Sequence, residues 1–151
     1  MTGPGPEPGG PIERFFASLS ARDWESFARV LAPQVVRVGP FGDRVTGSER
    51  YVDLLRGLVP SDYGNDVHRI TYAPGGRAGF ARVTEHLGYT DRPLHLEEAY
   101  AFELDAEELV SLVEIFLQMP DADPGGFGSA ASADSYASSG GPGPDARRLG
   151  G

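Results

Sequence analysis

The stretch from Gly79 to Leu104, GFARVTEHLGYTDRPLHLEEAYAFEL, constrains the fold more than any other part of the chain. Each half alternates between apolar and polar residues, the pattern of a β-strand with one buried face. Asp91 and Arg92 lie between the halves and predict a two-residue hairpin turn. The stretch therefore predicts a long antiparallel hairpin around which the remaining domain packs on one side.

Two glutamates interrupt the apolar face of this hairpin. The predicted turn places Glu85 opposite Glu98, on the face that also carries Ala81, Val83, Leu87, Tyr89, Leu94, Leu96, Tyr100, Phe102 and Leu104. Two carboxyl groups so close in an apolar wall cannot both ionise at low cost, so one pKa should rise and that group becomes a general acid. The pairing depends on the register that the turn sets.

The strand before the hairpin adds a histidine to this pair. Residues 66–73, DVHRITYA, predict a strand, and the glycine pair that follows predicts its turn. This pairing puts His68 on the inward face, diagonal to Glu85, where it would share the proton or orient a carboxylate. The alternative is a bulge that turns Glu85 outward, or an arginine such as Arg37 or Arg82 that neutralises the pair.

Three helical segments precede these strands. Apolar residues recur at helical spacing after Pro11, which suits the first turn of a helix, and after Asp23, a predicted N-cap. The third segment opens with Thr46 followed by Glu49, the spacing of a capping box. The first half of the domain is therefore predicted to be mainly helical.

Two further strands complete the expected sheet. Residues 34–39 predict a short strand between the second and third helices, and residues 109–118 predict a strand that is apolar on both faces and central. Helices gathered before strands favour an α+β domain, with helices covering one face of a curved antiparallel sheet. A cavity between the two layers is the place for a ligand.

Composition limits the domain to the middle of the chain. Residues 1–10 and 121–151 are rich in small residues and proline and are expected to be disordered, which leaves residues 11–120 as one domain. The net charge of -9 argues against nucleic-acid and anionic-membrane partners. The absence of cysteine excludes disulfides and thiolate chemistry. With no signal peptide and no apolar run of roughly 20 residues, a cytoplasmic location is expected.

This order of segments resembles the NTF2-like superfamily and, within it, the SnoaL-like group. The resemblance rests on IERFFASLSARDWESFARVLAPQVVRVGPFG, on VTGSERYVDLLRGL, and on the hairpin pair closing on LVSLVEIFL. It covers nearly all of residues 11–120. It implies a cone-shaped fold with the three N-terminal helices on the concave face of the sheet, an acid or base carboxylate in the cavity, no cofactor, and a homodimer.

Catalytic residues differ between branches of this superfamily, and the chain departs from two of them. The ketosteroid-isomerase-like branch implies an aspartate where Gly39 precedes Pro40, and an oxyanion-donating tyrosine where Phe15 stands. The Arg-x-Asp pattern of the limonene-epoxide-hydrolase-like branch is not evident. The SnoaL cyclases imply a carboxylate in the last strand, where Glu114 is the nearest match. The other interpretation of Glu114 is a structural ion pair at a dimer interface.

Four aromatic residues are candidates to contact a flat substrate, namely Phe16, Trp24, Tyr63 and Tyr100. The simpler interpretation is that most of them belong to the core and that Tyr63 is a solvated loop residue. The three histidines do not share one face under the predicted register, so no metal site is expected.

Two functions fit these observations. The first is a cofactor-independent enzyme of bacterial secondary metabolism, of polyketide or terpenoid type, for cyclisation, isomerisation or epoxide opening. Its substrate would be a small apolar or polycyclic molecule, and its acid and base groups would be Glu85, Glu98, Glu114 and His68. The second is a non-catalytic NTF2-like dimer that serves as a binding or assembly module. A cavity filled by side chains, with salt-bridged glutamates, would favour the second.

Overall fold

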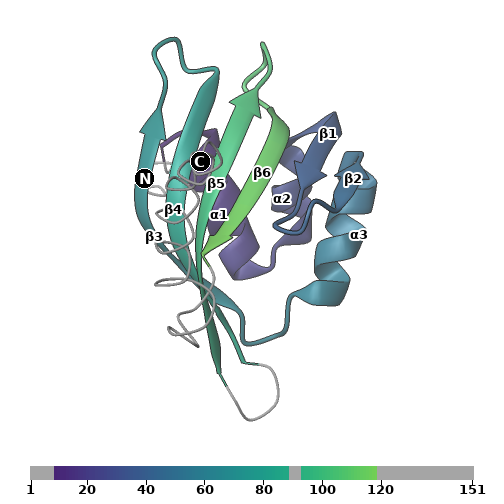
Figure 1. Cartoon of the computed structure of the whole chain (residues 1–151). Helices are drawn as coiled ribbons and strands as arrows, with labels where there is room; N and C mark the ends of the chain where they lie inside the picture. Colours follow the sequence, from purple (N-terminus) through teal and green to yellow (C-terminus); the bar gives the residue numbers. More distant parts are fainter. Residues whose placement is uncertain (1–8, 89–92, 119–151) are drawn as a thin grey trace, which may run out of the picture. The chain divides into compact units, whose positions relative to one another are not determined.

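The computed structural model describes residues 9–88 and 93–118, in which three helices are followed by most of a six-stranded sheet (Figure 1). The elements are α1 (Pro11–Ala21), α2 (Trp24–Arg29), β1 (Leu31–Val38), β2 (Arg44–Thr46), α3 (Ser48–Leu58), β3 (Gly64–Tyr72), β4 (Ala78–Leu87), β5 (Leu94–Leu104) and β6 (Val110–Gln118). The predicted α+β class is confirmed. The hairpin turn and nearly all of the two segments predicted to be disordered lie outside the described residues.

The helices begin close to where the sequence places them. Pro11 is the first residue of α1, and the Glu13 carboxylate accepts a hydrogen bond from the Gly10 N–H at 2.8 Å. Asp23 caps α2, because its Oδ1 accepts from the Ser26 N–H at 3.1 Å. The predicted cap at Thr46 is wrong: this residue pairs with β1 as the last residue of β2, and α3 begins after it without a side-chain cap.

The strands form one sheet in the order β2-β1-β6-β5-β4-β3. This sheet is mixed, since β1 runs parallel to β6 while the other neighbours are antiparallel, so the predicted all-antiparallel sheet is wrong at one pairing. No short turn connects β1 to β6, so hairpin geometry does not set their relative direction. The sheet curves around the helical layer, which covers its concave face (Figure 1).

The β4–β5 hairpin has a different register from the predicted one but the same faces. Glu85 pairs with Leu96, and Val83 pairs with Glu98. Each partner is two residues away from the prediction, and a shift of two residues leaves every side chain on its original face. Glu85 and Glu98 are therefore diagonal neighbours on the inward face rather than direct partners.

The β3–β4 pairing contains a bulge that the sequence does not reveal. The register shifts between Val67 and Arg69, so His68 is the residue without a partner in the ladder. His68 is exposed, and its Nε2 lies 2.7 Å from Thr84 Oγ1 on the outer face. The predicted inward position of His68 is therefore wrong.

The core lies between the helices and the inward face of the sheet. The Phe15 ring is central, with centroid distances of 4.9 Å to Phe27 and 5.0 Å to both Phe16 and Phe102. These fully buried rings fix α1 and α2 against β5. Among the described residues, no helix is long and apolar enough to cross a membrane.

Candidate functional site

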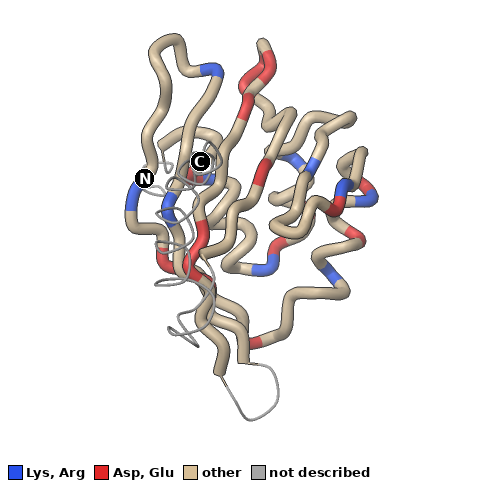
Figure 2. The backbone as a smooth tube through the Cα atoms, viewed as in Figure 1, with Lys and Arg blue, Asp and Glu red and all other residues tan. Residues whose placement is uncertain are grey.

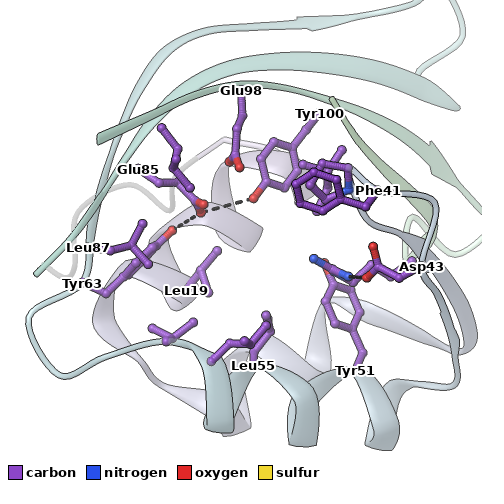
Figure 3. Close-up of a pocket in the computed structure, with 16 residues that line it drawn as sticks. Leu19, Phe41, Asp43, Tyr51, Leu55, Tyr63, Glu85, Leu87, Glu98 and Tyr100 are labelled. Atoms are coloured by element: carbon purple, nitrogen blue, oxygen red, sulfur yellow. Dashed lines mark hydrogen bonds and ion pairs between the residues drawn. The ribbon is translucent and has the colours of Figure 1, made fainter. Parts of the chain in front are cut away.

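A pocket of about 520 Å³ lies beside this core, between the helical layer and the β4–β5 hairpin (Figure 3). That volume is in the range of small-molecule sites. Much of its wall is apolar and comes from both layers, including Leu19, Leu55, Val59, Leu87, Leu96 and Ile115. The polar side chains that reach it are Arg37, Asp43, Tyr51, Tyr63, Glu85, Glu98 and Tyr100.

Two phenol groups converge on one carboxylate oxygen in this pocket. Tyr63 donates to Glu85 Oε2 at 2.5 Å, and Tyr100 donates to the same oxygen at 3.2 Å (Figure 3). Burial, followed by the negative charge of Glu85, raises the pKa of both phenols. The phenols therefore stay protonated and serve as hydrogen-bond donors. Asn65 Nδ2 in turn donates to the Tyr63 oxygen at 3.1 Å and to the Phe16 carbonyl at 3.3 Å.

Glu98 lies beside this cluster on β5 and is 8% exposed. Its burial, and next the negative charge of Glu85, raise the pKa of the Glu98 carboxyl to about 9, while the positive charge of Arg37 acts in the opposite direction. Glu98 is therefore protonated at neutral pH. Its Oε1 is buried and has no hydrogen-bond partner among the described residues. The pocket thus contains a neutral carboxylic acid next to a hydrogen-bonded carboxylate.

Arg37 is the buried cation of the pocket, and it pairs with an aspartate rather than with the glutamates. Its Nη1 lies 3.0 Å from Asp43 Oδ2, and its guanidinium carbon lies 5.8 Å from the centre of the Tyr51 ring. From the sequence, Arg37 is expected only as an alternative neutraliser of the glutamates, and its contacts with Asp43 and Tyr51 are not predicted. A signal for Arg37 exists, since the alternation of β1 puts it on the same face as the buried Val35.

The same aspartate accounts for Gly39. A Cβ atom at Gly39 would lie only 2.4 Å from Asp43 Oδ1, because the turn folds this carboxylate back over the glycine. The Gly39 N–H also donates to the Asp43 carbonyl at 2.7 Å. Position 39, where the resemblance to one branch implies an aspartate, is therefore a glycine. Its missing side chain leaves room for the carboxylate of Asp43.

Several predicted site residues lie outside this pocket. Glu114 is on the outer face of β6, where it pairs with Val38 and Ala101. Figure 2 shows the acidic positions of the backbone in red. Phe16 is a core residue, and Trp24 lines a separate hollow between α2 and α3. With His68 on the outer face, the pocket brings together Glu85, Glu98, Tyr63 and Tyr100 from the predicted set. Tyr63 is 8% exposed, so it is not a solvated loop residue.

The other two histidines meet on the outer face of the hairpin. His86 Nδ1 lies 2.7 Å from His95 Nδ1, and His86 Nε2 lies 2.8 Å from Asp66 Oδ2. Within residues 9–88 and 93–118, no group of three or more histidine, aspartate or glutamate side chains is arranged to hold a metal ion.

Known proteins share this architecture. Among solved structures, a "putative ketosteroid isomerase" from Kribbella flavida DSM 17836 is similar, with 27% identity, a TM-score of 0.65, and coverage of 76% of this chain and 79% of that chain. An "LEH-like epoxide hydrolase" of M. tuberculosis has 22% identity and a TM-score of 0.62, covering 72% of this chain and 80% of its own. A "putative polyketide cyclase" from Xanthomonas campestris pv. campestris has 16% identity and a TM-score of 0.61, covering 72% and 87%. No curated protein sequence matches the chain.

A sequence profile described as a SnoaL-like domain matches residues 12–112, from the first turn of α1 into β6. The match covers more than half of the chain and includes all the residues that line the pocket except Ile115. It agrees with the resemblance that the sequence segments carry, and the chain belongs to the SnoaL-like domain family.

Proposed function

We propose that the protein is a cofactor-independent acid–base enzyme that acts on a small apolar molecule carrying a reactive oxygen group. The observation that supports this proposal is the pairing of Glu85 with Glu98 in an apolar pocket. One carboxylate accepts two phenolic hydrogen bonds, and its neighbour is a neutral acid. A hydrogen-bonded carboxyl group next to a neutral carboxylic acid supplies the two groups that general acid–base catalysis requires.

In the proposed reaction, Glu85 is the base and Glu98 is the acid. Glu85 takes a proton from a carbon, a hydroxyl group or a water molecule, and its electron pair forms the new O–H bond. Glu98 gives its proton to the substrate oxygen as that oxygen gains charge. When the proton comes from carbon, the electron pair of the broken C–H bond forms an enol. When it comes from water or a hydroxyl group, the deprotonated oxygen forms a new C–O bond to an epoxide carbon while the ring C–O bond breaks. After this step the proton is on Glu85 and not on Glu98. Transfer in the reverse direction on the product, or exchange with solvent, restores the starting protonation of both groups.

The phenols position the base. Tyr63, just before β3, and Tyr100 on β5 both donate to Glu85 Oε2, and Asn65 on β3 donates to the Tyr63 oxygen. The apolar walls strengthen each of these interactions, because there is little competing water. The names of the similar structures, an isomerase, an epoxide hydrolase and a cyclase, all describe chemistry of this proton-transfer kind. A role in secondary metabolism is part of the same proposal.

Turnover of a substrate panel tests the proposal. The panel contains cyclic β,γ-unsaturated ketones, terpenoid epoxides and aromatic polyketide esters. For any substrate that is turned over, Glu85→Gln is expected to lower kcat about 10²–10⁴-fold. Glu103→Gln, on an exposed position of β5, is the control that keeps full activity. Full turnover by the Glu85 variant would contradict the assignment.

We also propose that two copies of the chain associate through the outer face of the sheet. Phe80 on β4 and Phe116 on β6 are 61% and 56% exposed. The β5 residues between these two strands are small, with Ala101 beside Phe80 and Ala99 beside Phe116. An exposed apolar surface of this kind is typical of an interface.

The charges on this face are self-complementary, which favours a second copy as the partner. Across β4, β5 and β6, one row of neighbouring residues is Phe80, Ala101 and Glu114. The adjacent row is Arg82, Ala99 and Phe116. A two-fold axis that lies in the interface, close to the diagonal from Phe80 to Phe116, brings Arg82 of one copy against Glu114 of the other. Concentration-dependent sedimentation tests this association, and a monomer at high concentration would contradict it.

A further inference from the structure

Arg37 combines deep burial with unused hydrogen-bonding capacity. It is 8% exposed and lines the pocket, yet its Nε has no hydrogen-bond partner among the described residues. A guanidinium group carries five N–H donors. One bonds to Asp43 and the group also bonds to the Tyr51 hydroxyl, whereas Nε is left without a partner among the described residues. A buried donor without a partner costs free energy, so such a group calls for an explanation.

The surroundings hold the guanidinium group in place without satisfying it. The Tyr51 ring lies beneath it, and the Asp43 side chain, which pairs with it, is 55% exposed. Asp43 therefore stays in contact with water, while Arg37 faces the enclosed space. A cation held in this way favours an anion that enters the pocket, because guanidinium binds planar oxyanions through parallel N–H···O bonds.

Arg37 and Glu85 occupy different ends of the pocket, and Glu98 lies between them. In Figure 3, Tyr63, Glu85 and Leu87 lie at one end, and Asp43, Phe41 and Tyr51 lie at the other. Arg37 belongs to the second end through its 3.0 Å contact with Asp43. A ligand that spans the pocket therefore meets proton-transfer groups at one end and a positive charge at the other.

We propose that Arg37 anchors a carboxylate of the substrate, so that the substrate class is a small apolar acid whose reactive part lies at Glu85 and Glu98. The identity of the reactive part rests on the proposed function; the anchor does not. The carboxylate takes the free edge of the guanidinium group, the apolar body lies against Leu19 and Leu55, and Asp43 turns toward solvent where needed. A neutral carbonyl or a cationic ammonium group at this position is the competing possibility.

Calorimetric binding of matched probes tests the anchor. Naphthalene-2-carboxylate and naphthalene-2-carboxamide have nearly the same shape and differ in charge. The wild-type protein is expected to prefer the carboxylate, and Arg37→Met is expected to weaken carboxylate binding about 10- to 100-fold while changing carboxamide binding little. Arg37→Lys keeps the charge and guards against a folding defect; it is expected to lose part of the preference.

Two further variants sharpen the test. Asp43→Asn removes the competing anion and is expected to tighten carboxylate binding. Arg29→Met removes the same charge from an exposed arginine that pairs with Glu25 on α2, and it is expected to leave both probes unaffected. The anchor is overturned if the wild type binds neither probe, if it binds the amide as tightly as the acid, or if the preference survives in Arg37→Met.

The Glu85→Gln variant separates this inference from the proposed function. It is expected to lose turnover and to keep the preference for the carboxylate probe. Full turnover in Glu85→Gln together with a preference that depends on Arg37 would overturn the acid–base assignment and leave the anchor in place. Lost turnover together with equal binding of both probes would overturn the anchor alone.

Discussion

Glu97 and Glu98 are consecutive residues of one strand, and their surroundings differ completely. Glu97 is exposed on the outer face, where both of its carboxylate oxygens accept from Thr84 Oγ1, at 2.9 and 3.0 Å. Glu98 is 8% exposed on the inward face, where burial and the charge of Glu85 raise its pKa to about 9. The pleat of the strand and the cover of the helical layer, not the residue type, therefore decide which glutamate has a raised pKa and can serve as an acid.

Glutamine replacements at these two positions give the largest expected contrast. Glu98→Gln keeps the shape and can still donate a hydrogen bond but cannot release a proton. Its kcat is expected to fall about 10²–10⁴-fold on whichever substrate the wild type turns over. Glu97→Gln is expected to retain the wild-type rate. Equal rates for all three proteins would remove the functional difference between the faces.

Ile115 and Phe116 repeat the comparison on β6 with apolar side chains. Ile115 is 6% exposed and lines the pocket, so Ile115→Ala is expected to lower the free energy of unfolding by about 2–5 kcal/mol. Phe116 is 56% exposed, and Phe116→Ala is expected to change that free energy by less than about 0.5 kcal/mol in the monomer while weakening association. Urea unfolding and sedimentation measure the two effects. A large loss of monomer stability in Phe116→Ala would contradict the assignment of faces.

The raised pKa of Glu98 predicts a pH dependence of stability. Between the ordinary value of 4.5 and about 9, the folded protein holds a proton that the unfolded chain releases, so this group lowers stability as the pH rises through that window. Glu98→Gln lacks this loss. The free energy of unfolding of Glu98→Gln, relative to that of the wild type, is expected to rise by up to about 1.4 kcal/mol per pH unit in that window and to level off outside it. Urea unfolding at a series of pH values measures this, and parallel curves would contradict it.

Tyr63 gives the smallest expected effect. Tyr63→Phe removes one of the two phenolic donors to Glu85 and leaves Tyr100 in place. The expected loss of stability is about 1 kcal/mol, and the expected loss of kcat is about tenfold, because the base is still held by one donor. The matched control is Tyr72→Phe, because the Tyr72 hydroxyl donates to Glu13 at 2.6 Å and neither residue lines the pocket. Equal kcat values for the two variants would exclude a positioning role for Tyr63.

The fold and the pair of glutamates were predictable because they depend on local periodicity. Alternation along β4 and β5 fixes the inward face, and this result tolerates a register error of two residues. The position of His68 was not predictable, because one extra residue in a bulge reverses the face and leaves no mark in the sequence. Glu114 was placed by resemblance rather than by alternation, and it lies on the outer face.

The polar partners of the pocket were harder to identify for a different reason. The contact between Arg37 and Asp43 depends on how the turn after β1 folds back, and the room for it depends on the missing Cβ at Gly39. The hydrogen bond from Tyr63 to Glu85 joins residues that the sequence separates by 22 positions. Such contacts become visible only once the layers are packed together.

Titration of the Glu98 carboxyl group by carbon-detected NMR tests the central claim most directly. Selective labelling of glutamate Cδ, with Glu98→Gln to assign the signal, reports its protonation state across the pH range. The account predicts a midpoint at about 9, so that Glu98 is protonated at neutral pH. A midpoint near the ordinary value of 4.5 would show that Glu98 is ionised at neutral pH, and the pocket would then lack its acid.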